Sequence, residues 1–226
     1  MTDVAEALAR VRARIAVACA RAGRPPDTVR LVAVGKGHDV GRLRAAVEVG
    51  QPDLAENYAQ ELARKAEALG ALPIRWHFVG RLQRNKCRIL APIVDVVHSI
   101  DDASTAEELG RRVVGLGRLV DVLVQVNLSG EATKAGCRPE HVQALVDRVR
   151  AIPGLRVVGL MTLPPPTPDP EQSRPWFRAL TQLARTHGLG ELSMGMSDDL
   201  EVAVEEGATM VRVGTALFGP RPKDMG

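Results

Sequence analysis

The sequence predicts an α/β fold, a single (β/α)8 TIM-type barrel, from the order of its segments. From Arg30 onward, short runs rich in β-branched residues alternate with longer stretches of helical period rich in Ala, Leu, Arg and Glu. About eight such runs occur, which is the repeat of this barrel. The expected strands lie at 31–35, 53–55, 75–79, 94–98, 119–126, 155–160, 191–193 and 209–213.

The apolar character of the runs supports a closed sheet. Residues 31–34 (LVAV) and 121–126 (DVLVQV) are almost continuously apolar, as expected where helices cover one face of a parallel sheet and side chains fill the other. A doubly wound open sheet is the alternative. Its first strand normally leads into a glycine-rich GxGxxG turn, whereas residues 35–40 read GKGHDV.

Residues 1–23 precede the first strand and alternate apolar positions with acids and arginines. This pattern is typical of an amphipathic helix rather than a signal peptide, and we expect the helix to pack on the barrel. A chain of 226 residues can bury one full core, so we expect residues 1–226 to form one domain. The proline-rich segment 163–170 predicts a stiff loop after the sixth strand.

Composition narrows the class and the location. The three cysteines, Cys19, Cys87 and Cys137, are far apart and form no CxxC pair, which predicts a reduced, cytoplasmic chain without disulfides or a zinc site. No apolar run approaches the length of a membrane span. We also expect a monomer, because no obvious apolar stripe marks the surface.

Charge alone does not make a nucleic-acid-binding protein. The net charge is +3, but arginines are spread among acidic residues, and aromatic residues make up only 3% of the chain. Single-stranded nucleic acids are usually bound by aromatic stacking inside a basic groove. We therefore expect no nucleic-acid partner.

Lys36 stands where the first strand would emerge into a loop. Partial desolvation of an amine at the mouth of an apolar core disfavours its charged form and frees the lone pair, so Lys36 is a candidate Schiff-base former. The alternative is a strand-end lysine whose head reaches water. Its position in the sequence leaves both interpretations open.

Arg212 lies in the eighth expected strand. Strand alternation would point Val211 and Val213 toward the helices and Arg212 into the barrel, where a permanent cation with five donors needs an acceptor. In a closed barrel the last strand lies beside the first, so Arg212 and Lys36 become neighbours. Two adjacent cations disfavour each other's charge and favour an anionic ligand between them.

The loops after the seventh and eighth strands are where barrels often hold a phosphate. In SMGMSDDLEVAVEEG, Gly195 would let the backbone approach a ligand, and Ser197 or Asp198 would either bind a phosphate or only cap the helix that follows. In VRVGTALFG, Gly214 and Thr215 suit phosphate oxygens, or a glycine kink at a barrel corner.

Three other polar residues at the expected mouth are weaker candidates. Asn57 follows the second strand and is either a ligand-facing amide or a helix cap. On the third strand, His77 lies on the face opposite Trp76 and Phe78, and a hydrogen-bonded core histidine is more common than a base. Lys134, in the loop NLSGEATKAG, would touch an anion or only water.

Several motifs occur in one order: Lys36, AENYAQE, WHFVGRLQRNK, VNLSGEATKAG, GLMTLPP, SMGMSDDLEVAVEEG and VRVGTALFG. With them, residues 28–219 strongly resemble the pyridoxal phosphate homeostasis proteins. That family is similar to the N-terminal barrel domain of alanine racemase and to bacterial-type ornithine decarboxylase. The resemblance implies that the cofactor is pyridoxal 5'-phosphate.

The resemblance also implies a set of cofactor-binding residues and no metal ligand. Lys36 would form the Schiff base, three residues of the last two loops would hold the phosphate, Arg212 would donate to the pyridine nitrogen, and two residues would lie near the ring. The set is Lys36, Asn57, Met196, Ser197, Arg212, Gly214 and Thr215.

The chain departs from the family pattern beside the lysine. Gly35 and Gly37 stand where serine and threonine are usual, and Leu54 and Ala55 replace a common Phe-Gly pair. We expect the loss of the two hydroxyls to alter hydration and affinity at the aldehyde site, but not the capacity to form an imine.

The family keeps cofactor and amino-acid pools in balance and has no established reaction, which implies a carrier with no catalytic residues and with pyridoxal-phosphate-dependent apo-enzymes as possible partners. The sequence after the last strand, ending in RPKDMG, shows no second domain, and Tyr58 is the one tyrosine. A two-base racemase needs an acid or base on each face of the substrate carbon. The alternative is a racemase-like enzyme acting on amino acids.

Overall fold

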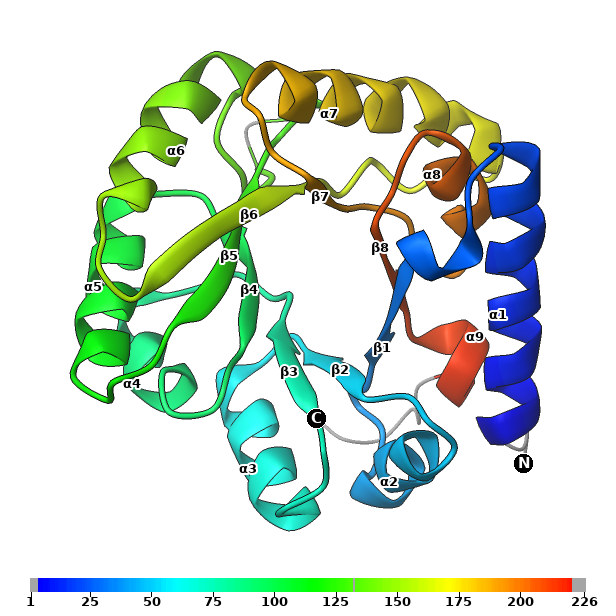
Figure 1. The fold of residues 1–226 in the computed structure, drawn as a ribbon, viewed down its shortest axis with the longest axis horizontal. Helices are drawn as coiled ribbons and strands as arrows, with labels where there is room; N and C mark the ends of the chain where they lie inside the picture. The colour runs from blue at the N-terminus through cyan, green and yellow to red at the C-terminus, as the bar shows by residue number, and fades with distance from the viewer. Residues whose placement is uncertain (1–3, 132, 221–226) are drawn as a thin grey trace.

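A computed structural model describes residues 4–131 and 133–220, and in it eight parallel strands close into a barrel (Figure 1). Each strand boundary lies within two residues of its expected place, because each of the eight expected runs forms a strand. The strands are β1 (Arg30–Val34), β2 (Asp53–Glu56), β3 (Arg75–Phe78), β4 (Val96–Ile100), β5 (Val120–Gln125), β6 (Leu155–Met161), β7 (Glu191–Ser193) and β8 (Met210–Val213).

Closure occurs between the first and last strands. β1 and β8 pair in parallel, with Val32 opposite Arg212. The predicted barrel is thereby confirmed and the open-sheet alternative is wrong. This pairing joins residues that are far apart in the chain, and it places the ends of both strands at one mouth of the barrel.

Helices surround the sheet in Figure 1. An aspartate caps the start of two of them. Asp39 accepts from Arg42 N at the start of α2, and Asp102 accepts from Thr105 N at the start of α5. The helices are α1 (Val4–Arg21), α2 (Val40–Glu48), α3 (Ala59–Leu69), α4 (Cys87–Leu90), α5 (Ala103–Val114), α6 (Val142–Arg150), α7 (Arg174–Thr186), α8 (Leu200–Glu205) and α9 (Thr215–Phe218). Short 3-10 turns cover Pro26–Thr28, Arg84–Lys86, Pro139–His141 and Pro170–Ser173.

The N-terminal helix α1 packs on the barrel as expected. It runs beside α8 and α9 (Figure 1), and Leu8, Val11 and Ile15 on its buried face follow the helical period. Arg14 reaches from α1 to the Glu201 carboxylate of α8 at 2.6 Å. The extent of the single domain, residues 1–226, stays a prediction, since both termini lie outside the described residues.

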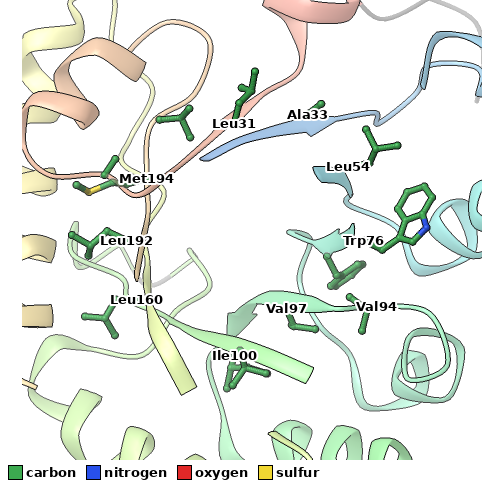
Figure 2. Packing of buried hydrophobic residues seen from close by; sticks show 14 of the residues in the cluster. Leu31, Ala33, Leu54, Trp76, Val94, Val97, Ile100, Leu160, Leu192 and Met194 are labelled. Atoms are coloured by element: carbon green, nitrogen blue, oxygen red, sulfur yellow. The ribbon is translucent and has the colours of Figure 1, made fainter. Parts of the chain in front are cut away.

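Alternate strand residues face two separate apolar layers. One layer lies between sheet and helices and includes Leu54 and Trp76 (Figure 2). The other fills the barrel interior and includes Val32, Ala55 and Met210. The interior also buries polar side chains, which is unusual for a barrel core packed with branched apolar residues.

The sequence also makes predictions about the proline-rich loop, membrane spans and the cysteines. After β6 the chain runs through residues 162–169 without helix or strand, as the prolines predict. Among the described residues, no helix is long and apolar enough to cross a membrane. Cys19, Cys87 and Cys137 are free thiols.

Candidate functional site

A cavity of about 260 Å³ opens at the mouth of the barrel, where the carboxyl ends of the strands meet. This is close to the lower end of the range for small-molecule sites. A larger hollow of about 650 Å³ on the outer surface near α7 and α8 contains none of the predicted site residues. The mouth cavity contains all seven; it is lined by Val34, Lys36, His38, Asn57, Val79, Leu163, Met196, Ser197, Asp198, Arg212, Gly214 and Thr215.

Lys36 follows β1 and is half-buried in this cavity. Its Nζ lies 5.3 Å from the centroid of the Tyr58 ring, a cation–π contact. Within the described part of the chain, no carboxylate lies in salt-bridge range of Lys36. Lys36 therefore lines a cavity, and no carboxylate of the described residues neutralises its charge.

A buried ionic cluster lies directly behind the Lys36 loop. Lys65 Nζ donates to Gly35 O at 2.8 Å, to Glu56 Oε1 at 2.7 Å and to Glu61 Oε1 at 2.7 Å. The Glu61 carboxylate also accepts from Gly37 N at 3.0 Å. Two backbone groups flanking Lys36 are thus held by this Lys65 cluster.

Sequence reasoning missed the Lys65 cluster, although its spacing carried a signal. Glu61 and Lys65 are an i,i+4 pair on α3, and Glu56 is an outward-facing residue of β2 next to that helix. Lys65 and Glu56 both have side chains that are 0% exposed. Burial raises the pKa of Glu56 to about 7, because a charged carboxylate is poorly solvated there.

The cluster gives a structural reason for the glycines beside Lys36. A Cβ on Gly35 would lie 2.6 Å from Glu56 Oε1 and 2.9 Å from the Leu43 side chain, so any larger residue displaces the cluster. Gly37 has φ +75°, a conformation that favours glycine. The two departures from the family pattern belong to this local packing.

Arg212 lies inside the barrel, as strand alternation predicts. Its residue is 4% exposed, Nη1 donates to Ser193 Oγ at 2.6 Å and Nη2 to Thr162 O at 3.1 Å. No described carboxylate pairs with it, and burial lowers the pKa of its guanidinium to about 10. It lines the same cavity as Lys36, so the two predicted neighbours do meet there, and its other donors need an acceptor.

The loops after β7 and β8 are joined by one hydrogen bond, because Ala216 N donates to Ser197 Oγ at 3.3 Å. Helix α8 begins at Leu200, with Asp199 in the N-cap position. The carboxylate of Asp199 accepts instead from Met196 N at 2.7 Å and so shapes the loop. The alternative that Ser197 or Asp198 only caps this helix is therefore wrong.

Gly195 and Gly214, in the loops after β7 and β8, are required for different structural reasons. A Cβ on Gly195 would lie 2.4 Å from Ala203 Cβ, and its φ is +86°; it serves the packing of α8 and lies outside the cavity lining. The packing against Ala203 accounts for this glycine, and the approach of a ligand to its backbone stays a prediction. A Cβ on Gly214 would lie 3.1 Å from Val34 O, so this glycine permits close contact across the β1–β8 seam beside the cavity.

The weaker candidates separate clearly. Asn57 lines the cavity, and Tyr58 occupies the N-cap position of α3, so the capping alternative for Asn57 is wrong. His77 is a hydrogen-bonded core histidine, as expected. Lys134 pairs with Glu131 at 2.9 Å and is not among the cavity-lining residues. His38 was missed; it lines the cavity two positions after Lys36, which was its only signal.

Fold and site together define a barrel of the alanine racemase N-terminal class. The family model described as "Alanine racemase, N-terminal domain" matches residues 7–222. An alanine racemase from Clostridium difficile 630 superposes with a TM-score of 0.75 at 16% identity, covering 98% of this chain and 58% of the racemase chain. At that identity the likeness concerns the fold alone.

Curated relatives are more specific. Two proteins named pyridoxal phosphate homeostasis protein are 47% identical (Pseudomonas aeruginosa, 98% of this chain and 97% of the relative) and 43% identical (Aquifex aeolicus, 97% and 99%). The chain belongs to this pyridoxal phosphate homeostasis family. The structure of PipY of Synechococcus elongatus PCC7942 with pyridoxal phosphate bound superposes with a TM-score of 0.82 at 35% identity, covering 96% of this chain and all of PipY.

Proposed function

We propose that this protein binds pyridoxal 5'-phosphate on Lys36 and serves intracellular cofactor homeostasis as a carrier. The observation that carries the proposal is that one cavity brings together Lys36 and Arg212, whose guanidinium pairs with no described carboxylate. A relative with a solved structure holds this cofactor, and the curated relatives are named for its homeostasis.

The residues present fit the cofactor. Lys36 Nζ would form a C=N bond with the aldehyde carbon, and the aldehyde oxygen would leave as water. The unused donors of Arg212 suit the pyridine nitrogen, which accepts a hydrogen bond in its neutral form. Ser197, Gly214 and Thr215 would hold the phosphate, with Asn57 and Met196 beside the ring.

Two groups around the site support a carrier role without turnover, although an arginine on the pyridine nitrogen alone does not exclude catalysis. When bound, the cofactor can supply an electron sink, but an arginine at its nitrogen leaves the ring neutral and weakens that sink. Tyr58, the one tyrosine of the chain, lies beside Lys36 and so does not supply an acid or base on the opposite face. A racemase-like enzyme is the alternative, and amino-acid racemisation at ordinary enzymatic rates by the purified protein would establish it.

Lys36→Ala tests the binding mode. We expect wild-type protein mixed with pyridoxal phosphate to develop the visible absorbance of an imine, which borohydride fixes to the peptide containing Lys36. Lys36→Ala should abolish this absorbance, because no other described lysine lines the cavity. Lys86→Ala is the matched control, since Lys86 lies in the 3-10 turn Arg84–Lys86 on the outside. An imine of undiminished intensity in Lys36→Ala rules the proposal out.

Delivery is tested separately from binding. We expect the loaded carrier to reactivate a pyridoxal-phosphate-dependent apo-enzyme in the presence of a trap for the free cofactor, while loaded Lys36→Ala cannot be prepared. A cytoplasmic, monomeric state without a nucleic-acid partner is part of the same proposal, and the three free thiols support the cytoplasmic location. Size-exclusion chromatography coupled to light scattering checks the monomer.

A further inference from the structure

Five side chains form a continuous hydrogen-bonded chain through the barrel interior, which we call the interior chain. It starts at the Asp53 carboxylate on β2 and ends at Arg212 on β8. The successive distances are 2.9 Å from Asp53 Oδ1 to His77 Nε2, 2.8 Å from His77 Nδ1 to His98 Nε2, 2.7 Å from His98 Nδ1 to Ser193 Oγ, and 2.6 Å from Ser193 Oγ to Arg212 Nη1.

The interior chain joins the two ends of the barrel. Asp53 is the first residue of β2 and its side chain is 14% exposed, so it lies at the end opposite the cavity. The three middle residues, His77, His98 and Ser193, are 0% exposed, and Arg212 opens into the cavity. The interior chain thus reaches from the surface at one end of the barrel to the candidate ligand site at the other end.

The direction of every hydrogen bond follows from the two ends. A carboxylate only accepts, so His77 must donate to Asp53 from Nε2, and its Nδ1 in the neutral ring accepts. His98 then donates from Nε2 and accepts at Nδ1 from the Ser193 hydroxyl. Ser193 Oγ is left to accept from Arg212, which can only donate.

Neutral imidazoles are what this burial favours. Desolvation lowers the pKa of His77, and it lowers the pKa of His98 well below its ordinary value. A run of aligned hydrogen bonds polarises each of its members, so the negative end at Asp53 strengthens the acceptor that Ser193 offers to Arg212. No described carboxylate contacts the guanidinium, and the interior chain links it to the Asp53 carboxylate.

We propose that the interior chain holds the Arg212 guanidinium in the orientation that presents its free donors to the ligand in the mouth, with Ser193, His98, His77 and Asp53 as positioning residues. The ligand-facing part rests on the proposed function. The internal part concerns the protein alone and predicts one tautomer, with the proton on Nε2, for both His77 and His98.

Ser193→Ala removes the hydroxyl that links Arg212 to the rest of the interior chain. Loss of a hydrogen bond to a charged group lowers the binding free energy, so we expect about a tenfold loss of pyridoxal phosphate affinity. We also expect the absorbance band of the bound cofactor to shift. Ser99→Ala is the matched control, because Ser99 Oγ is also buried on the sheet but has no hydrogen-bond partner within the described residues. A merely structural serine would leave the absorbance band of the folded, loaded protein unmoved.

Asp53→Asn cuts the charge at the far end without touching the mouth. We expect an affinity loss of about threefold or more, and changed ¹⁵N signals of His77 and His98 in the cofactor-free protein. Asp121→Asn is its control, since Asp121 pairs with Arg75 and Arg156 at the same end of the barrel and is outside the interior chain.

The outcomes separate the two proposals. If wild type forms no imine, the proposed function is overturned, and the ligand-facing role of the interior chain with it. If wild type binds and Ser193→Ala and Asp53→Asn bind with unchanged affinity and absorbance, only the positioning role is overturned. A cofactor-free protein in which ¹⁵N signals place the His98 proton on Nδ1 overturns the chain itself, whatever the binding result.

Discussion

Two buried cations, Lys65 and Arg212, lie near the same mouth of the barrel, and their surroundings differ. Lys65, behind the β1–α2 loop, contacts the carboxylates of Glu56 and Glu61. Arg212, in β8, contacts a hydroxyl and a backbone carbonyl but no described carboxylate. Only Arg212 lines the cavity.

The difference shows which cation serves the fold and which serves a ligand. A buried cation is costly unless it is paired and hydrogen-bonded. The protein satisfies Lys65 completely, with three acceptors within 2.8 Å. It satisfies Arg212 only in part and leaves donors toward the cavity, which a ligand acceptor would complete. Substitutions at the two sites should therefore have opposite signatures.

Lys65→Met should have the largest effect on stability. It leaves Glu56 and Glu61 without their cation, and breaking a buried pair in this way costs about 3–5 kcal/mol. Urea denaturation at pH 8 measures the change, with Lys86→Met as the control on the surface. A loss below about 1 kcal/mol would mean that the two carboxylates find other partners, and the contrast with Arg212 would fail.

Glu56→Gln should remove a pH dependence of stability. The folded chain holds the pKa of Glu56 at about 7, above its ordinary value of 4.5, so between these values the folded state binds more protons and its stability falls as pH rises. The full change is about 3 kcal/mol. We expect the free energy of unfolding of wild type, minus that of Glu56→Gln, to fall by this order from pH 4 to pH 8.

Histidine titration does not obscure this comparison. The pKa values of His77 and His98 are lowered by burial, so their contribution is present above the pKa of an unfolded histidine and is lost as pH falls. Both histidines are kept in Glu56→Gln, and the difference between the two proteins cancels them. A pH-independent difference would contradict the raised Glu56 pKa.

Arg212→Met should have the smallest effect on stability and a clear effect on binding. Removing a cation that has no carboxylate partner also removes its desolvation cost, so we expect the free energy of unfolding to change by only about 1 kcal/mol. The affinity for pyridoxal phosphate should fall about tenfold or more, because a hydrogen bond to a charged donor is lost. Thermal denaturation and an absorbance titration of the same preparation measure both. A large loss of stability with unchanged affinity would reverse the comparison.

The sequence predicts the burial of Arg212 better than the burial of Lys65. Arg212 interrupts a run of valines at an inward position, and that local conflict between charge and burial made it visible. Lys65 follows the ordinary helical pattern of charged residues on α3, and its i,i+4 spacing from Glu61 is equally typical of a solvated surface pair. Its burial depends on how α3 packs against β2 and the Lys36 loop.

Features that depend on a few neighbouring residues, such as the strands, could be predicted from the sequence. Apolar runs and turn residues placed all eight strands, because strand burial leaves a mark within a few residues. The same barrel geometry brought the seven expected site residues to one mouth. The start of α8 and the reason for Gly195 were not predictable, since both depend on contacts with Asp199 and Ala203 that only the packed loop makes.

The sequence by itself determined the barrel, its N-terminal helix and the position of Lys36 and Arg212 at the strand ends. Only the tertiary structure decided that Asp53, His77, His98 and Ser193 join Arg212 in one chain. Each of these four residues comes from a different strand, and each alone resembles an ordinary polar residue. Closure of the sheet brings their side chains into one dry interior, where every hydrogen-bonding group must find a partner and the directions of the bonds follow from the two charged ends.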